Sequence, residues 1–497
     1  MISARICLRG RVFKMRELHV DYLYQLLKNQ THKEGKTLRI TPFSSRSKKK
    51  IRGNFIKVIG EFVRRICDFK VDYAKLKEKE FSYLLSKEKY DNNKIDEMEE
   101  KFLNHISEQV KFQNDGDHYD FLRFLKEYFF DKDSIKIIHP FFYNYIRVDD
   151  NNNEYSKYGK FMRDVLISNK EAFKRIFSNN NADNILTQLL INQNKILVEI
   201  KDLEPEYQPL IPQLIKLYEE DILFISNHRD FFLKSFSLIT HFYVFMYICQ
   251  LVVKFERFFK ANYDTLDPLY FTLEWESLNR RRKAVDNIDS FKFIKNNLPK
   301  LFPHVHTLSQ LSHNTANVDV EDLGRDNKIR VLTYPEIKQY LLDGILNEEL
   351  FLSDLHDWMI KYTSIFKKEF PKGYEPKFQD VDEALKEMFD LVNKGTSDDV
   401  CKKYGGNLED LGAYEFIKNR GSLGQVFNIS YNLLIVITAV SVKNERVPLK
   451  QLFLEYERRG IKLDNYSKDE VVKALDKLNL IDKKSDSGDA QYVKPIL

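Results

Sequence analysis

The sequence predicts a mostly helical protein, with a multi-helical body followed by a C-terminal winged helix-turn-helix domain. Glycine and proline, which interrupt helices, account for only 17 and 13 of the 497 residues. Long stretches of the chain place apolar residues three or four positions apart, which is the spacing of a helix buried on one face. The last fifty residues combine two such stretches with a short hairpin pattern.

The first helix of the C-terminal domain is expected at residues 448–459. Its apolar residues are spaced for one buried face, namely Leu449, Leu452, Phe453 and Tyr456. Pro448 suits a first helical position because no N–H is needed there, and Gly460 suits the cap that ends the helix.

A second helix is expected from Ser467, where Glu470 three residues later completes a capping box. Its buried stripe consists of Val471, Ala474, Leu475 and Leu478. Residues 480–493 follow as two extended runs around an Asp/Ser/Gly turn. With an apolar helix expected at 429–442, these elements have the order of a winged helix, a shape that enters a DNA groove or docks on a protein.

The domain organisation follows from shifts in composition. We expect a basic N-terminal arm at 1–53, a helical body at 54–400 with a break near 298–330, a linker at 401–425 and the winged helix domain at 426–497. Helical patterns in the body cover residues 54–69, 94–112, 119–130, 158–177, 182–202 and 210–259, and a further helix begins at Pro335. No repeat of 20–50 residues is found, which argues against a solenoid.

One uncharged stretch, residues 235–253, is long enough to raise the question of a membrane span. It contains His241, Gln250 and several hydroxyl side chains, so a buried central helix is favoured. The four cysteines have no close pair, which fits a reducing cytoplasm and argues against a disulfide framework or a cysteine-based zinc site. The N-terminus lacks the apolar core of a signal peptide. We therefore expect a cytoplasmic protein without membrane contact.

The charge is distributed unevenly along the chain. Residues 1–70 hold 18 Lys and Arg against 5 Asp and Glu, a net of +13; because the whole chain carries +5, the remainder carries −8. The N-terminal excess includes the basic run Arg46, Lys48, Lys49, Lys50 and Arg52. Such a run is typical of contacts with nucleic-acid phosphates. A solvated loop, or an arm bound to the acidic body of the same chain, is an equal alternative.

A second basic cluster follows Trp275, and two pairs of lysines lie in the C-terminal domain. The cluster consists of Arg280, Arg281, Arg282 and Lys283, and the lysine pairs are Lys473 with Lys477 and Lys483 with Lys484. All are candidate DNA contacts, although a solvated helix end also explains the cluster. On the expected recognition helix, Asp469 and Asp476 balance Lys473 and Lys477, so the exposed face is neutral. DNA contact and protein docking therefore remain equal hypotheses for the winged helix.

Catalytic motifs are weak throughout. Gly35-Lys36-Thr37 resembles the end of a phosphate-binding loop, but Gln30 stands where the upstream glycine is required. Glu199 and Lys201, with Asp183 upstream, resemble a nuclease motif, yet residues 183–201 read better as one helix. The histidine cluster His304, His306 and His313 matches no zinc spacing and is better explained as loop or helix-end histidines. We therefore expect no enzyme activity, no metal and no cofactor.

Three stretches near the C-terminus carry a family resemblance. They are Gly421-Ser422-Leu423-Gly424, the run Phe-Asn-Ile-Ser-Tyr-Asn-Leu-Leu at 427–434, and the chain end at 483–497. Together they resemble the DptG (DndG) family of bacterial DNA phosphorothioation-dependent restriction systems. The segment 275–283 is also similar, with less specific motifs. The likeness spans most of the chain, is firmest over its last hundred residues, and carries over no catalytic residue.

The resemblance implies a role in a three-component module that restricts invading DNA lacking sulfur in its backbone. In such modules a companion subunit supplies an ATPase or helicase-like motor, which agrees with the missing phosphate-binding loop here. The leading hypothesis is therefore an accessory subunit that binds double-stranded DNA and companion subunits. The alternatives are a purely structural adaptor without DNA contact and a divergent metal-dependent nuclease.

Overall fold

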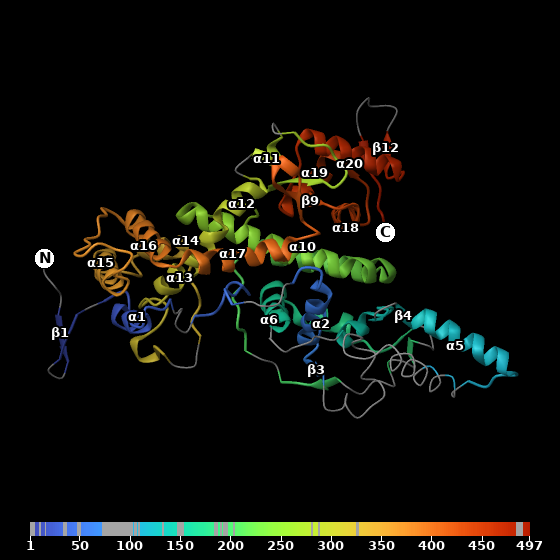
Figure 1. Cartoon of the computed structure of the whole chain (residues 1–497), viewed down its shortest axis with the longest axis horizontal. Helices are drawn as coiled ribbons and strands as arrows, with labels where there is room; N and C mark the ends of the chain where they lie inside the picture. The colour runs from blue at the N-terminus through green and yellow to red at the C-terminus, as the bar shows by residue number, and fades with distance from the viewer. Residues whose placement is uncertain are drawn as a thin grey trace.

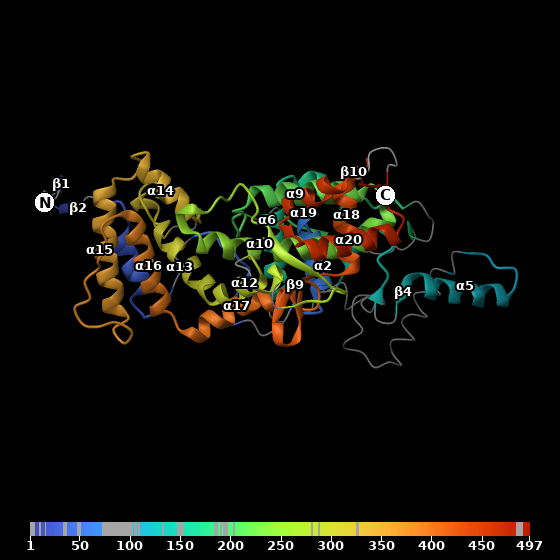
Figure 2. The ribbon, with the colours of Figure 1, turned by 90° about the horizontal axis from the view of Figure 1, so that it is seen from above.

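The structure is a computed structural model, which describes residues 5–8, 11–14, 16–32, 37–46, 51–71, 103, 107, 110–131, 134–146, 154–182, 187–188, 191, 197–201, 204–279, 282–286, 289–324, 328–483 and 491–497. Helices dominate these residues and strands are short, so the predicted mostly helical class is confirmed. The molecule is elongated, and helix α5 projects from the end opposite the N-terminus (Figures 1 and 2).

The centre of the fold is the long helix α10 (Arg229–Glu256), preceded by α9 (Pro212–Ser226). Helix α10 packs against α9, α2, α12, α13, α17 and α18, and lies between the C-terminal elements and the α2 layer (Figure 1). It is long and apolar enough to cross a membrane, but 89% of its most apolar window is buried inside the protein. This burial fits the expected central helix. The single helix expected at 210–259 is instead broken at Asn227 and His228.

On one side of α10, helix α2 (Phe55–Ile66) packs against α6 (Glu154–Leu166). Their backbones approach closely because Gly159 has no Cβ; one built there would lie 2.6 Å from Glu61 Cβ. The other elements of this layer are β3 (Phe69–Val71), α5 (Asp115–Phe129), β4 (Phe130–Asp131), β5 (Ser134–Ile135), the 3₁₀ helix η2 (Pro140–Tyr145), α7 (Lys170–Ser178) and β6 (Leu197–Glu199).

Helices expected at 54–69 and 119–130 are confirmed by α2 and α5. The helix expected at 158–177 is divided into α6 and α7, because Asn169 caps a new helix by accepting from the Ala172 N–H. The helix expected at 182–202 is wrong at its end, where β6 pairs antiparallel with β3. Of the helix expected at 94–112, only residues 103, 107 and 110–112 lie within the described part of the chain.

The end of the molecule nearer the N-terminus is a group of helices, three of which (α12, α13 and α17) pack against α10. It contains α1 (Val20–Leu27), α12 (Phe291–Asn297), η4 (Leu298–Lys300), α13 (Leu301–Leu311), η5 (Val320–Asp322), α14 (Tyr334–Leu342), α15 (Glu348–Ile365), α16 (Val381–Gly395) and α17 (Asp398–Gly412). Thr333 and Glu336 form a capping box at the start of α14, which confirms the helix expected from Pro335. A strand hairpin, β1 (Arg5–Leu8) and β2 (Arg11–Lys14), precedes this group.

Helices lie within three segments that were expected to be an arm, a break and a linker. The N-terminal arm at 1–53 contains helix α1, which packs on α15. The break near 298–330 contains η4 and the buried helix α13. The linker at 401–425 begins inside α17, which packs on η4, α13 and α10. Helix α17 continues through Gly405 and Gly406. Burial of its apolar side chains, such as that of Leu408, stabilises the helix across these two glycines.

Two small sheets lie in the third part of the fold, which is called here the C-terminal elements and also includes segments from residues 258–286. The C-terminal elements are η3 (Phe258–Lys260), β7 (Leu269–Leu273), α11 (Lys283–Asp286), β8 (Ile417–Asn419), η6 (Gly421–Leu423), β9 (Gln425–Ile429), α18 (Tyr431–Val442), β10 (Val447–Pro448), α19 (Leu449–Arg458), β11 (Ile461–Lys462), α20 (Asn465–Lys477), β12 (Ile481–Lys483) and β13 (Gln491–Val493). The sheets have the strand orders β11-β7-β9-β8 and β10-β13-β12.

Strand β11 pairs in parallel with β7, so residues on both sides of the expected domain boundary share one sheet. Gly460, expected as a helix cap, has φ +82 between α19 and β11. Helix α20 begins two residues before Ser467, because Asp464 is the cap and accepts from the Ser467 N–H at 3.0 Å. The C-terminal segment therefore shares a sheet with the body, through β11 and β7, and is not attached to it by a linker alone.

Candidate functional site

The N-terminal basic segment, defined here as residues 37–52, is held against the body where the structure describes it. Arg39 forms a bridge with Tyr207: its N–H donates to the Glu206 carbonyl at 3.0 Å and its carbonyl accepts from Gln208 at 2.8 Å. Thr37 forms a similar bridge with Ile329. The Ile51 N–H donates to Asp410 at 2.6 Å. Backbone pairing, in addition to charge, therefore fixes the course of this segment.

Beside this segment lies a cavity of about 460 Å³, called here the basic pocket. Three cationic side chains line it, those of Arg39, Arg46 and Lys157. The rest of its lining is His32, Ile40, Thr41, Pro42, Phe43, Ser44, Ser45, Tyr207, Phe302, Val305 and Tyr404. No Asp or Glu is among these described lining residues. The basic pocket therefore favours an anion over a cation.

The cations of the basic pocket differ in their surroundings. Lys157 donates to Glu154 at 3.1 Å, so part of its charge is compensated. Arg39 is exposed and lies beside Tyr207. Burial raises the pKa of Tyr207 to about 12, while the positive charge of Arg39 lowers it. Arg46 is exposed, and no ion pair of its guanidinium is found within the described part of the chain. Exposed arginine is the side chain best suited to bidentate phosphate contact.

One wall of the basic pocket is aromatic. The Tyr404 ring lies edge-on to Phe302 at 5.2 Å and to Phe43 at 5.8 Å. The Tyr404 hydroxyl shares a hydrogen bond with Thr41. His32 stacks on Phe366 at 4.6 Å, and burial lowers the pKa of His32 to about 4. His32 is therefore neutral near pH 7 and adds no charge to the pocket.

The structure places the basic run only in part. Arg46 lines the basic pocket, whereas Lys48, Lys49 and Lys50 lie outside the described residues. Arg52 is exposed, lies 3.8 Å from Asp410 and covers the Tyr414 ring at 5.4 Å. An exposed ion pair of this length leaves the guanidinium accessible to solvent and to phosphate.

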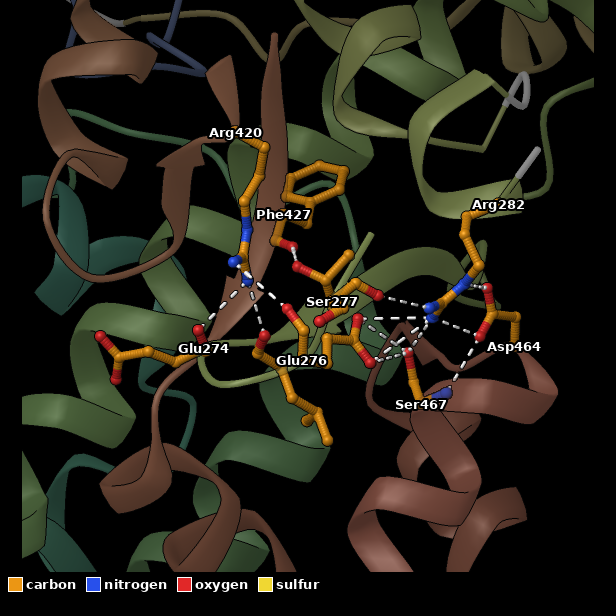
Figure 3. A network of polar contacts seen from close by, with 10 residues as sticks. Glu274, Glu276, Ser277, Arg282, Arg420, Phe427, Asp464 and Ser467 are labelled. Carbon is orange, nitrogen blue, oxygen red and sulfur yellow. Dashed lines mark hydrogen bonds and ion pairs between the residues drawn. The ribbon is translucent and has the colours of Figure 1, made fainter. Parts of the chain in front are cut away.

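Within the basic cluster at 280–283, Arg282 is 6% exposed and its guanidinium is hydrogen-bonded to other residues of the protein (Figure 3). It donates to the Asp464 carboxylate at 2.5 and 2.7 Å and to the Ser467 hydroxyl at 2.9 Å. Glu276 lies 3.4 Å away and also accepts from Ser467 at 2.9 Å. Burial alone would lower the pKa of Arg282, but the Asp464 hydrogen bond and both carboxylate charges raise it. Arg282 is therefore a buried cation whose guanidinium is already bound by other residues of the protein, and this position does not favour the expected DNA contact.

The Arg282 network has a neighbour in Arg420, which precedes η6. Its guanidinium donates to the carbonyls of Leu273 at 2.8 Å, Glu274 at 3.3 Å and Glu276 at 3.4 Å (Figure 3). Together Arg282 and Arg420 fix the turn after β7 against α20 and the β8–β9 hairpin. Within this cluster Lys283 is exposed, near the Tyr270 ring at 5.9 Å, and Arg280 and Arg281 lie outside the described residues.

The C-terminal lysines give a weak electrostatic surface. Lys473 is exposed and pairs with Glu470 at 2.7 Å, and that hydrogen bond lowers the pKa of Glu470. Lys477 is exposed on the same helix as Asp469 and Asp476. Lys483 lies in β12 with only its backbone described, and Lys484 lies outside the described residues. The described face of α20 therefore has balanced charge.

The histidines singled out as metal candidates are buried in or next to α13. His304 contacts the Tyr334 hydroxyl at 2.9 Å and Glu256 at 3.2 Å, and His313 contacts the Ser309 carbonyl at 2.8 Å. Neither ring nitrogen of His306 has a hydrogen-bond partner among the described residues. The loop or helix-end position expected for this cluster is wrong for His304 and His306, which lie within α13.

No group of three His, Cys, Asp or Glu side chains arranged to hold a metal ion is found in the described part of the chain. Glu199 lies on the edge strand β6 and Lys201 follows it, while Asp183 lies outside the described residues.

Sequence reasoning missed Arg39, Lys157 and the aromatic wall of the basic pocket. Arg39 belongs to the basic N-terminal segment, which is a signal that could have included it. Lys157 lies in a helix with mixed charges and carries no such signal, since only the fold brings it beside Arg46.

The chain matches no protein-family model, and no curated protein sequence matches it.

Proposed function

We propose that this chain is an accessory subunit of a phosphorothioation-dependent restriction complex, which binds double-stranded DNA and companion subunits, including an ATPase or helicase-like protein. One observation carries the DNA-binding half: Arg39, Arg46 and Lys157 line a single cavity, in which the described lining has no carboxylate. Affinity for duplex DNA comes mainly from cations placed against phosphates, and it is independent of sequence. The restriction role rests on the family resemblance of the C-terminal stretches.

We also propose that the C-terminal elements form a winged helix-turn-helix unit. The order α18, β10, α19, β11, α20, β12, β13 supports this assignment, as do the antiparallel pairs Val447↔Val493 and Ile481↔Val493. The balanced charge of α20 gives little attraction for phosphate. In this proposal the unit contributes to assembly with companion subunits, while the basic segment holds DNA.

The test is duplex binding by the full chain at low and at physiological salt. We expect Arg46→Gln to weaken binding to duplexes of any sequence, since phosphate contact carries no sequence preference. Lys473→Gln is the matched control, because it removes one exposed cation from α20 and should leave affinity unchanged. Equal affinities of wild type and Arg46→Gln at both salt concentrations would contradict the assignment.

A second candidate function is a structural adaptor that touches only its companions. The balanced face of α20 favours it, because neutral polar surfaces dock proteins more readily than they attract DNA. Co-purification with a motor subunit, together with absence of duplex binding at low salt, would establish the adaptor and exclude DNA contact.

The remaining alternative is a metal-dependent nuclease. Metal-dependent DNA cleavage that is lost on substitution of Glu199 would indicate it.

A further inference from the structure

We propose that the basic pocket holds a single nucleotide unit, with its phosphate on the cationic rim and its base against the aromatic wall. This inference rests on the proposed function, because it assigns a ligand to the same site. The ligand class is a phosphate group linked to a planar ring. A free nucleotide and the end of a DNA strand both belong to this class.

The size of the cavity sets the first limit on its ligand. A volume of about 460 Å³ is within the range of sites for small molecules and cofactors. A DNA duplex is too wide to enter a cavity of this volume, because its major groove alone is about 12 Å wide and the whole duplex is wider still. Duplex DNA can therefore contact only the rim, whereas the interior admits a free nucleotide or one unpaired residue of a strand.

The charges of the rim select for phosphate. Arg39 and Arg46 are both exposed on the segment that runs along the opening, and Lys157 comes from α6. Glu154 compensates Lys157 but is not part of the lining. Hydroxyl groups of Ser44, Ser45 and other lining residues add hydrogen-bond donors for phosphate oxygens. Cations and hydroxyls at one opening are the usual donors to phosphate.

The interior adds a surface that phosphate alone does not need. Phe302 is half-buried and lines the cavity, with Tyr404 edge-on to it at 5.2 Å. Val305 extends this apolar wall. Stacking of a base on an aromatic side chain contributes about 1–3 kcal/mol, which corresponds to roughly a fivefold to 150-fold gain in affinity. A ligand with a ring therefore gains over inorganic phosphate.

The experiment is calorimetric titration of the full-length chain with deoxyadenosine monophosphate and, separately, with inorganic phosphate. We expect one saturable site for the nucleotide and at least about fivefold weaker binding of phosphate. Arg46→Gln with Lys157→Gln should weaken both ligands, whereas Phe302→Leu should weaken only the nucleotide. Lys283→Gln, an exposed lysine elsewhere, is the matched control and should change neither.

Equal affinity for the nucleotide and phosphate would overturn the ring assignment, and no nucleotide binding would overturn the proposal. Duplex binding measured on the same samples separates the two claims. If duplex binds and the nucleotide does not, the nucleotide inference fails alone; if neither binds, the DNA-binding function fails with it. Given nucleotide binding, displacement by a 5′-phosphorylated single strand supports a strand end as the ligand, and lack of displacement supports a free nucleotide. Melting temperatures of all variants verify that each is folded.

Discussion

Arg459 and Asp221 form a fully buried ion pair that joins the end of α19 to α9. The Arg459 guanidinium donates to the two Asp221 oxygens at 2.7 and 2.8 Å, with 1% and 0% of the two side chains exposed. The Tyr243 hydroxyl donates to the same carboxylate at 2.5 Å. The C-terminal elements are thus anchored to the central helices by a charge pair as well as by the β7–β11 pairing.

We expect Asp221→Ala to destabilise the protein by about 3–5 kcal/mol, because it leaves the Arg459 charge buried without its main partner. Urea denaturation of wild type and variant measures the change. Glu220→Ala is the matched control, since Glu220 lies next to Asp221 and, among the described residues, forms an ion pair only with exposed Arg458, at 3.7 Å. The control should cost about 1 kcal/mol or less. Equal losses in the two variants would refute the role given to the buried pair.

Two adjacent glycines in α17 should respond in opposite directions to alanine. A Cβ at Gly405 would lie 2.3 Å from the Leu298 carbonyl oxygen, whereas a Cβ at Gly406 would meet nothing within 4 Å. Gly406→Ala should therefore stabilise the helix by about 0.5–1 kcal/mol. Gly405→Ala should cost about 1–3 kcal/mol through the clash. Melting temperatures test this, and a stable Gly405→Ala variant would show that α17 does not pack on η4 as described.

Arg282 and Lys283 should separate stability from DNA contact. Arg282→Gln leaves Glu276 and Asp464 without their cation, so we expect a loss of about 3 kcal/mol in unfolding free energy. Lys283→Gln should have almost no effect on stability, because that side chain is exposed. Duplex affinity per folded molecule should be unchanged in Arg282→Gln. A weaker salt dependence of DNA binding in that variant would instead identify Arg282 as a phosphate contact.

Buried histidines should make the protein sensitive to acid. Burial lowers the pKa of His241 and of His313 to about 4 and that of His306 well below its ordinary value. Between pH 6.5 and 4 the unfolded chain binds more protons than the folded one, so stability is present above pH 6.5 and is lost as pH falls. Each unit of difference in pKa corresponds to about 1.4 kcal/mol. Thermal melts across this range measure the loss.

His306→Phe should reduce that acid sensitivity at little cost near pH 7.5, since neither ring nitrogen of His306 has a hydrogen-bond partner among the described residues. His356→Gln is the control, because the His356 side chain is 42% exposed, and it should leave the pH profile unchanged. A His306→Phe variant with the acid profile of wild type would show that this ring does not titrate on unfolding.

Helical periodicity predicts much of this fold, because apolar spacing reflects local geometry. It locates α2 and α5 closely, and it merges α9 with α10 because Asn227 and His228 interrupt the helix without glycine or proline. It also extends a helix over β6, whose pairing with β3 depends on a strand more than a hundred residues away. Periodicity therefore finds helices more reliably than the points at which tertiary contacts end them.

The candidate site was predictable only in part, because charge alone does not determine exposure. Arg46 and Arg282 both belong to basic clusters, yet only Arg46 is exposed. What distinguishes them is Asp464, 182 residues from Arg282 in sequence and in direct contact with it. Lys157 likewise belongs to the site because of the tertiary fold. Helix α6 lies beside the basic segment, and nothing in the local sequence of Lys157 indicates this.

The salt dependence of duplex binding tests the central claim most directly. The observed binding constant of the full chain is measured between about 50 and 200 mM salt, for wild type and for the triple variant Arg39→Gln, Arg46→Gln, Lys157→Gln. We expect the slope of log K against log salt to become shallower by about 0.9 for each phosphate contact removed, while Lys473→Gln with Lys477→Gln keeps the wild-type slope. A triple variant that is folded and retains the wild-type slope would contradict the assignment of DNA contact to the basic pocket.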